Sequence, residues 1–178
     1  MQEPHEATPA SFVRRLVAFL LDGIVLLVAG FALLALTTVV IGPTVVLDTD
    51  AAASPVSEVR GWRVVLNAVL LAALSGLYFV ISWARAGWTP GQRLFRIAVR
   101  GSSPLAGISP RQAVLRWALL GAPLGLASAL TVSMPLLFLA VVVASFAWFA
   151  VLVMTTLLSR TGRGLHDRLA GTTVIRRA

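Results

Sequence analysis

The chain has no cysteine and no lysine among its 178 residues, and its only histidines are His5 and His166. The absence of cysteine excludes disulfides and thiolate metal sites. Two distant histidines exclude a histidine-rich metal site, so we expect no metal and no cofactor. Charge is also scarce, because charged residues make up 12% of the chain, where a soluble domain averages about 25%. The composition therefore argues against an ordinary soluble domain.

Apolar residues fill the chain instead. They make up 58% of it, and the mean hydropathy is +0.89. Three stretches carry no charge: residues 23–47, 64–84 and 117–159. About 20 apolar residues span a bilayer core, so the third stretch is long enough for two crossings. Ser128, Thr131, Ser133 and Pro135 predict its turn near residues 128–135.

These lengths predict an all-α membrane protein with four transmembrane helices. We expect the helices at about residues 16–41, 64–84, 117–131 and 135–158, with an interfacial segment between the second and the third. Residues 1–11 would form a tail, and residues 12–178 a single membrane domain.

The arginines indicate the orientation. All fifteen basic residues are arginine, and only Arg60 and Arg63 fall in the segment between the first two predicted helices, which also holds three acids. The positive-inside rule places that segment outside and the other three polar segments in the cytoplasm. We therefore expect a multi-pass membrane protein with both termini cytoplasmic. The use of arginine alone as the basic residue is typical of a GC-rich bacterial genome, so we expect the membrane to be a bacterial inner membrane. The net charge of +8 favours anionic lipid headgroups over nucleic acid as the partner, because the arginines punctuate apolar runs.

Asp22 lies inside the first apolar run, seven residues after Arg15. A carboxylate at membrane depth costs roughly 2.5–3.5 kcal/mol on insertion scales and normally faces a partner or water. Seven residues are about two helical turns, so both side chains share a face, offset by roughly 10 Å along the axis. Asp22 is either a functional carboxylate or a residue that fixes helix packing.

Three other segments carry a pattern. Residues 87–92 form a tight turn after the second predicted helix. Residues 93–100 fit an interfacial helix with arginines on one face, or alternatively a strand at 97–100. Ser109 and Pro110 predict a helix start. Residues 121–125 combine a GxxxG spacing with a proline, which favours close packing with a kink over a broken helix that lines a substrate site.

Tryptophans fall near the predicted helix ends. Trp62, Trp83, Trp88 and Trp117 would form interfacial belts, and Trp148 would pack in mid-helix.

No catalytic group is recognisable. The pair His166 and Asp167 lacks a serine or cysteine nucleophile in a known context and lacks a third group. We expect no enzyme activity and no catalytic residue.

Taken in order, three motifs resemble the RDD family of bacterial membrane proteins. The first is Arg15, Ala18 and Asp22 in the first helix. The second is Gly87-Trp88-Thr89-Pro90-Gly91-Gln92, which is similar to the family's G-x-T-x-G-K, with Gln92 in place of lysine. The third is Leu165-His166-Asp167, followed by Ala170-Gly171-Thr172. The resemblance runs from about Phe12 to Ile175.

The resemblance implies a fold more than an activity. The resemblance implies a bacterial membrane protein; transport has been proposed for the family, and sodium/proton exchange for some members. Together with the carboxylate in the first membrane run, this predicts a transport protein with Asp22 as the carrier of a cation or proton. Four short helices can hardly enclose a solvated pathway alone, so we expect it to work as an oligomer. The alternative is an accessory or assembly subunit of a larger membrane complex. We expect Arg15, Asp22 and Asp167 to meet near the cytoplasmic face as a binding cluster.

Overall fold

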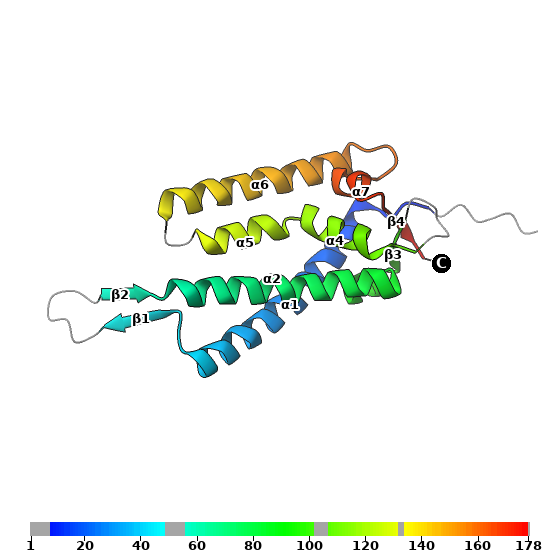
Figure 1. Cartoon of the computed structure of the whole chain (residues 1–178). Coiled ribbons are helices and arrows are strands. Elements are labelled where there is room, and N and C mark those ends of the chain that lie inside the picture. The colour runs from blue at the N-terminus through cyan, green and yellow to red at the C-terminus, as the bar shows by residue number, and fades with distance from the viewer. Residues whose placement is uncertain (1–7, 49–55, 102–106, 132–133, 178) are drawn as a thin grey trace, which may run out of the picture.

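A computed structural model of the chain describes residues 8–48, 56–101, 107–131 and 134–177. Three of its helices are long and apolar enough to cross a membrane: α1 (Phe12–Ile41), α2 (Gly61–Ala86) and α6 (Pro135–Leu157). A pair of shorter helices, α4 (Pro110–Leu119) and α5 (Ala122–Leu130), provides a fourth span when the two are taken together. The predicted class, an all-α membrane protein, is confirmed (Figure 1).

The helices are longer than the uncharged stretches suggested. The first begins at Phe12 rather than near residue 16, and the second covers 61–86 rather than 64–84. Arginines lie inside these ends because a long side chain can carry its charge to polar groups beyond the helix. Arg63 illustrates this, since its Nη1 donates to the carbonyl of Pro43 at 2.7 Å.

The third predicted span, 117–131, is not one straight helix. The first of its two helices begins at Pro110 with Ser109 as the N-cap, as expected from the sequence. The structure adds a reciprocal capping box between Ser109 and Gln112. α4 and α5 then meet at 51°, and Gly121 between them has a φ of 113°. The expected kink is confirmed, but close packing is not. A Cβ at Gly121 or Gly125 would meet no atom within 4 Å, so neither glycine serves a close helix interface, and Gly121 serves the backbone turn.

The turn in the last long apolar stretch is where the sequence predicted it. α5 ends at Leu130 and α6 starts at Pro135.

A small sheet closes one end of the bundle. α3 (Pro90–Leu94) follows α2 and leads into β3 (Ile97–Arg100), which pairs antiparallel with β4 (Thr173–Arg176) next to α7 (Leu165–Leu169). The interfacial helix over residues 93–100 is therefore wrong, and the alternative strand is right. Ile97, Ala98 and Val99 are fully buried, so pairing with β4 covers three apolar residues in a row.

The first and last described residues lie at that same end (Figure 1). Ala10 N donates to the carbonyl of Val174, and Pro9 forms a bridge with Ile175. The hairpin of β1 (Val45–Asp48) and β2 (Val56–Val59) lies at the opposite end. The polypeptide thus enters and leaves the bundle on one side, which requires an even number of crossings.

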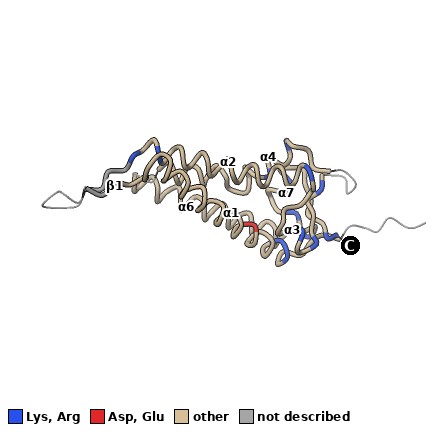
Figure 2. Tube along the Cα trace, turned by 90° about the horizontal axis from the view of Figure 1, so that it is seen from below, with Lys and Arg blue, Asp and Glu red and all other residues tan. Residues whose placement is uncertain are grey.

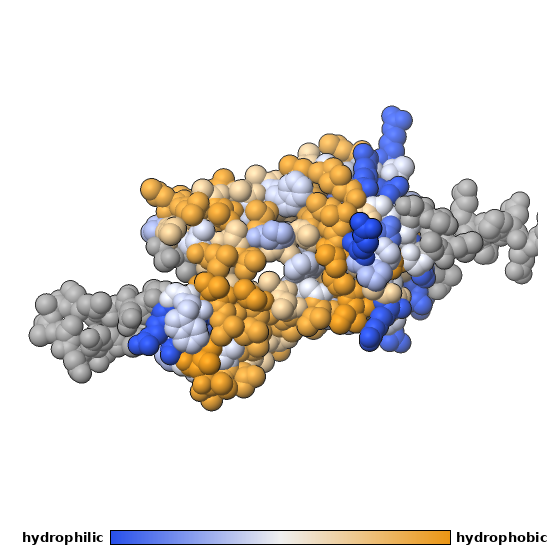
Figure 3. All heavy atoms as spheres, viewed as in Figure 1, coloured by the Kyte–Doolittle hydropathy of each residue, from blue (hydrophilic) through white to orange (hydrophobic). Residues whose placement is uncertain are grey.

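Charge and hydropathy divide the surface in the same way. Figure 2 shows most of the arginines gathered at the end that holds the termini, with a few beside the hairpin. A wide apolar band separates them from a smaller polar cluster beside the hairpin (Figure 3). This is the pattern of a protein whose middle lies in lipid.

The tryptophan at position 83 is a correction to the predicted interfacial belt. Its side chain is 1% exposed and stacks on Phe79, with ring centroids 5.0 Å apart. Trp62, by contrast, is 57% exposed at the start of α2. Trp83 lies one helical turn before the end of α2, where α3 and β3 fold back and cover it. The position of Trp83 along the helix does not reveal this burial.

Candidate functional site

Asp22 is buried and accepts hydrogen bonds only from neutral donors among the described residues. The Tyr78 hydroxyl donates to Oδ1 at 2.6 Å, and the Thr89 hydroxyl to Oδ2 at 2.5 Å. The backbone N–H of Gly91 donates to Oδ1 at 2.8 Å. Hydrogen bonds to a carboxylate favour its charged form, so these donors offset part of the cost of burying the charge.

The turn after α2 delivers two of those donors. Thr89 caps α3 in a reciprocal box with Gln92, with Pro90 in the first turn. The Gln92 side chain also accepts from Trp83 Nε1 at 3.1 Å, which ties the turn to the core. A Cβ on Gly91 would stand 2.4 Å from the carbonyl oxygen of Ala18. Ala18 and Gly91 are therefore small because α1 and α3 touch backbone to backbone here.

Asp167 forms the centre of a second network. It is 0% exposed, and Arg15 Nη1 donates to its Oδ2 at 3.0 Å. Arg116 Nη1 donates to its Oδ1 and, at 2.8 Å, to the hydroxyl of Thr172. Arg15 also donates to the carbonyls of Ala10 and Val174. One buried guanidinium, Arg116, and one largely buried guanidinium, Arg15, thus share one carboxylate and join α1, α4, α7 and β4.

Electrostatics in this network favour an ionised Asp167. Burial alone would raise the pKa of Asp167, but Arg116, His166 and Arg15 outweigh burial and hold the pKa below its usual range. His166 shows the opposite balance. Burial and the positive charge of Arg116 lower its pKa to about 4, although Asp167 lies 3.5 Å from its Nε2. His166 is therefore neutral at pH 7.

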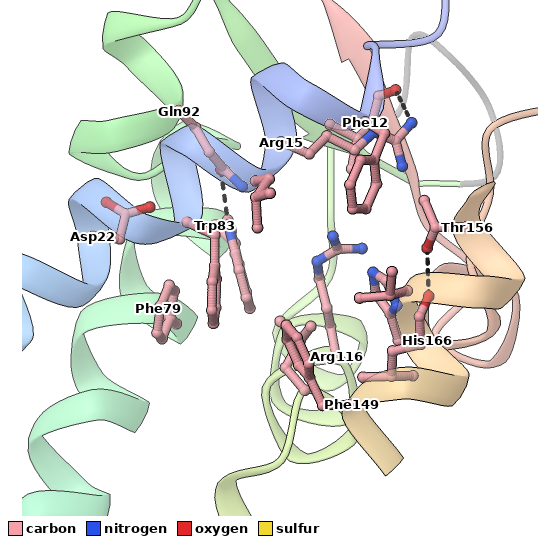
Figure 4. A pocket seen from close by; sticks show the side chains of 16 residues that line it. Phe12, Arg15, Asp22, Phe79, Trp83, Gln92, Arg116, Phe149, Thr156 and His166 are labelled. Carbon is pink, nitrogen blue, oxygen red and sulfur yellow. Dashed lines mark hydrogen bonds between the residues drawn. The ribbon is translucent and has the colours of Figure 1, made fainter. Parts of the chain in front are cut away.

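The structure brings together only part of the predicted cluster. Arg15 and Asp167 meet, but Asp22 takes its hydrogen bonds from Tyr78 in α2 and from the turn after α2. Trp83 lies between Asp22 and Arg116 (Figure 4). Arg15 lies near the start of α1 and turns to Asp167 and to backbone carbonyls that only the folded chain places beside it. The shared helical face of Arg15 and Asp22 did not decide their partners.

A cavity of about 110 Å³ separates the two networks. Asp22 borders it on one side, and Arg15, Arg116 and His166 border it on another (Figure 4). Most of the remaining wall is apolar: Phe12, Phe19, Phe79, Phe149, Leu152 and Val153. Arg116 Nε and His166 Nδ1 are buried without a hydrogen-bond partner in the described part of the chain. The cavity is thus mostly apolar, with a carboxylate on one wall and two guanidiniums on another.

Within the described ranges, no three His, Cys, Asp or Glu side chains lie close enough to hold a metal ion.

Sequence reasoning missed Arg116, Tyr78 and Thr89 as partners of the two aspartates. Thr89 belongs to a recognised motif, which could have identified it. Arg116 could have been suspected, because it lies beside an apolar stretch with no nearby acid in sequence. Tyr78, the only tyrosine, carries no signal of its own within an apolar helix.

Long apolar helices, arginines at one end and two buried aspartates define a small multi-pass integral membrane protein. A family model for the RDD family matches residues 9–171, and the chain belongs to this family. No curated protein and no solved structure matches it.

Proposed function

We propose that the protein is a transporter that exchanges a proton for a small cation, with Asp22 as the carrier carboxylate. The observation that carries this proposal is the Asp22 carboxylate itself, which is 1% exposed, has no charged partner among the described residues and borders a cavity. An ionisable group at membrane depth is expensive and usually marks an ion or proton pathway.

The donors around Asp22 suit a group that changes protonation. Two of the three are hydroxyls, on Tyr78 and Thr89. A hydroxyl can turn and accept a hydrogen bond as well as donate one. Protonated Asp22 could therefore donate to Thr89 while Gly91 N–H still donates to the other oxygen. Both protonation states then keep their hydrogen bonds, as a reversible proton carrier requires.

The cavity would give Asp22 access from the arginine-rich end. By the positive-inside rule this end is cytoplasmic, and both termini then lie on the cytoplasmic side of the bacterial inner membrane. Anionic headgroups would surround the arginines there.

The described residues of a single copy form no evident route from the cavity to the opposite side of the membrane. α1 packs against α2 and α3, while α6 packs against α5 and α7. Much of the apolar surface of α1 and α6 is left exposed, including Phe31, Val39 and Phe146. We therefore propose a homo-oligomer, in which neighbouring copies complete the pathway.

The same exposed faces support a second candidate, an accessory or assembly subunit that docks against other membrane proteins. In that case Asp22 would serve only to hold the turn after α2 against α1. The two candidates differ in whether Asp22 must change its charge.

The test is exchange in liposomes. Purified protein is reconstituted with a pH-sensitive dye, and a sodium gradient is imposed. We expect a pH change that Asp22→Asn abolishes. Asparagine is nearly isosteric, and its amide can accept from Gly91 and donate to Thr89, so the variant should stay folded. Glu58→Gln, which removes an acid from the hairpin, should keep the flux.

Flux that survives in Asp22→Asn would reject the carrier role. Absence of flux from well-folded wild-type protein, together with a stoichiometric partner after purification in mild detergent, would favour the subunit function.

A further inference from the structure

We infer that the cavity between the two aspartate networks binds an amphiphile with one oxyanion and one hydrocarbon chain, its charged end against Arg116. This inference concerns a ligand site on the opposite wall from Asp22 and does not depend on cation exchange.

The charge near Asp167 is unbalanced. Arg15 and Arg116 bring two positive charges, Asp167 brings one negative charge, and His166 is neutral. Both hydrogen bonds of Arg116 to Asp167 and Thr172 use Nη1, and its Nε has no partner in the described part of the chain. Arg116 is only 4% exposed. A buried guanidinium with an unused donor is costly, so an anion beside it would be held strongly.

Asp22 does not supply that anion. It borders the cavity too, but three neutral donors occupy its oxygens. Trp83 separates it from Arg116, whose guanidinium lies 5.3 Å from the centre of the Trp83 ring. Among the described residues, the positive charge at Arg116 therefore faces the cavity with no acidic partner other than Asp167.

The rest of the wall suits a hydrocarbon chain. Phe19 and Phe79 both line the cavity and stack on each other with ring centroids 6.4 Å apart, and Phe149 and Leu152 cover the side formed by α6. Phe19 and Phe149 are also 38% and 47% exposed, on helices whose outer surfaces face lipid. The mouth of the cavity is therefore apolar, and a molecule could enter it sideways from the bilayer.

The size of the cavity and its one uncompensated positive charge favour an amphiphile with one hydrocarbon chain over a lipid with two. A cavity of about 110 Å³ receives a head and the first part of a tail, and the remaining tail would extend into the lipid between α1 and α6. Two sources share this chemistry: a free long-chain carboxylate and a lysophospholipid with a phosphate head.

The experiment is native mass spectrometry of the full chain in a mild detergent, titrated with oleate, methyl oleate, a lysophosphatidylglycerol and acetate. We expect one oleate per chain, bound at least tenfold more tightly than methyl oleate or acetate. Tighter binding of the lysophospholipid than of oleate would also support the site and would assign the anion to a lipid phosphate. Equal binding of oleate and methyl oleate would overturn the inference.

A matched pair of variants localises the ligand. Val153→Phe fills the cavity from α6, and we expect it to weaken oleate binding at least tenfold. Val143→Phe makes the same change on the same helix at a residue that is 58% exposed, and it should leave binding unchanged. If both variants bind oleate like the wild type, the cavity is not the site. The wild-type comparison of oleate with methyl oleate decides the question even if Val153→Phe does not fold.

Discussion

Asp22 Oδ1 accepts a hydrogen bond from the backbone N–H of Gly91 at 2.8 Å, although 69 residues separate the two in sequence. The contact holds the turn after α2 against the first membrane helix. It also explains why the first motif and the second belong together, because Ala18, Asp22 and Gly91 form one tightly packed junction.

Replacing Gly91 with alanine should disrupt this junction. The added Cβ would lie 2.4 Å from the carbonyl oxygen of Ala18 and 2.8 Å from Asp22 Oδ1. Neither atom is the end of a flexible side chain free to move away, and overpacking of this kind costs about 1–3 kcal/mol. We expect a clear fall in melting temperature in detergent. Gly23→Ala is the control: Gly23 lies in α1 next to Asp22, and a Cβ there would meet no atom within 4 Å, so this variant should melt like the wild type.

Arg15→Lys should destabilise the protein even though it keeps the charge. Arg15 uses Nε, Nη1 and Nη2 for three acceptors on Ala10, Asp167 and Val174. A lysine has one nitrogen, which cannot reach all three directions of the guanidinium fork. We expect lower thermal stability and faster proteolysis of the terminal segments. Arg14→Lys is the matched control, and an equal loss in both variants would mean that the geometry of the fork does not matter.

Stability should fall as the pH is lowered from about 7 to 5, because His166 is buried in its neutral form. Its pKa is about 4 in the folded protein and 6.5 ordinarily. The unfolded chain therefore takes up a proton first, and the folded state loses stability between pH 6.5 and 4, by up to roughly 3 kcal/mol. Asp167 acts in the same direction at lower pH, because its folded pKa is depressed.

Melting curves at several pH values measure this effect. His166→Gln should flatten the pH dependence between 7 and 5, whereas His5→Gln, at the other histidine, should leave it intact. An unchanged slope in His166→Gln would assign the loss to another group.

The topology predicts opposite results for two reporter fusions. A reporter inserted at residue 50, between the strands of the hairpin, should be active outside the cytoplasm, and one after residue 178 should be active inside. The arginine distribution motivates the sides, and the pairing of residues 8–10 with β4 requires both ends of the described chain to share one side. A C-terminal reporter outside would contradict the proposed orientation.

The long apolar helices were readable from the sequence, because the cost of placing charge in lipid depends on local composition. The described residues hold three such spans, or four when α4 and α5 are counted together. The turn before Pro135 and the capped start at Ser109 were also readable, since proline and capping residues act on their own neighbours. The three motifs indicated the family because each is a short run of residues that can be read directly from the sequence.

The partners of the buried charges were decided only by the tertiary structure. Spacing along α1 placed Arg15 and Asp22 on one face and predicted that they would meet, yet Asp22 binds the turn after α2 and Arg15 binds Asp167. The sequence also left the strand at 97–100 undecided, because its partner lies in the last residues of the chain. Hydrogen bonds, ion pairs and cavities join segments far apart in sequence, so their geometry exists only once the helices have packed.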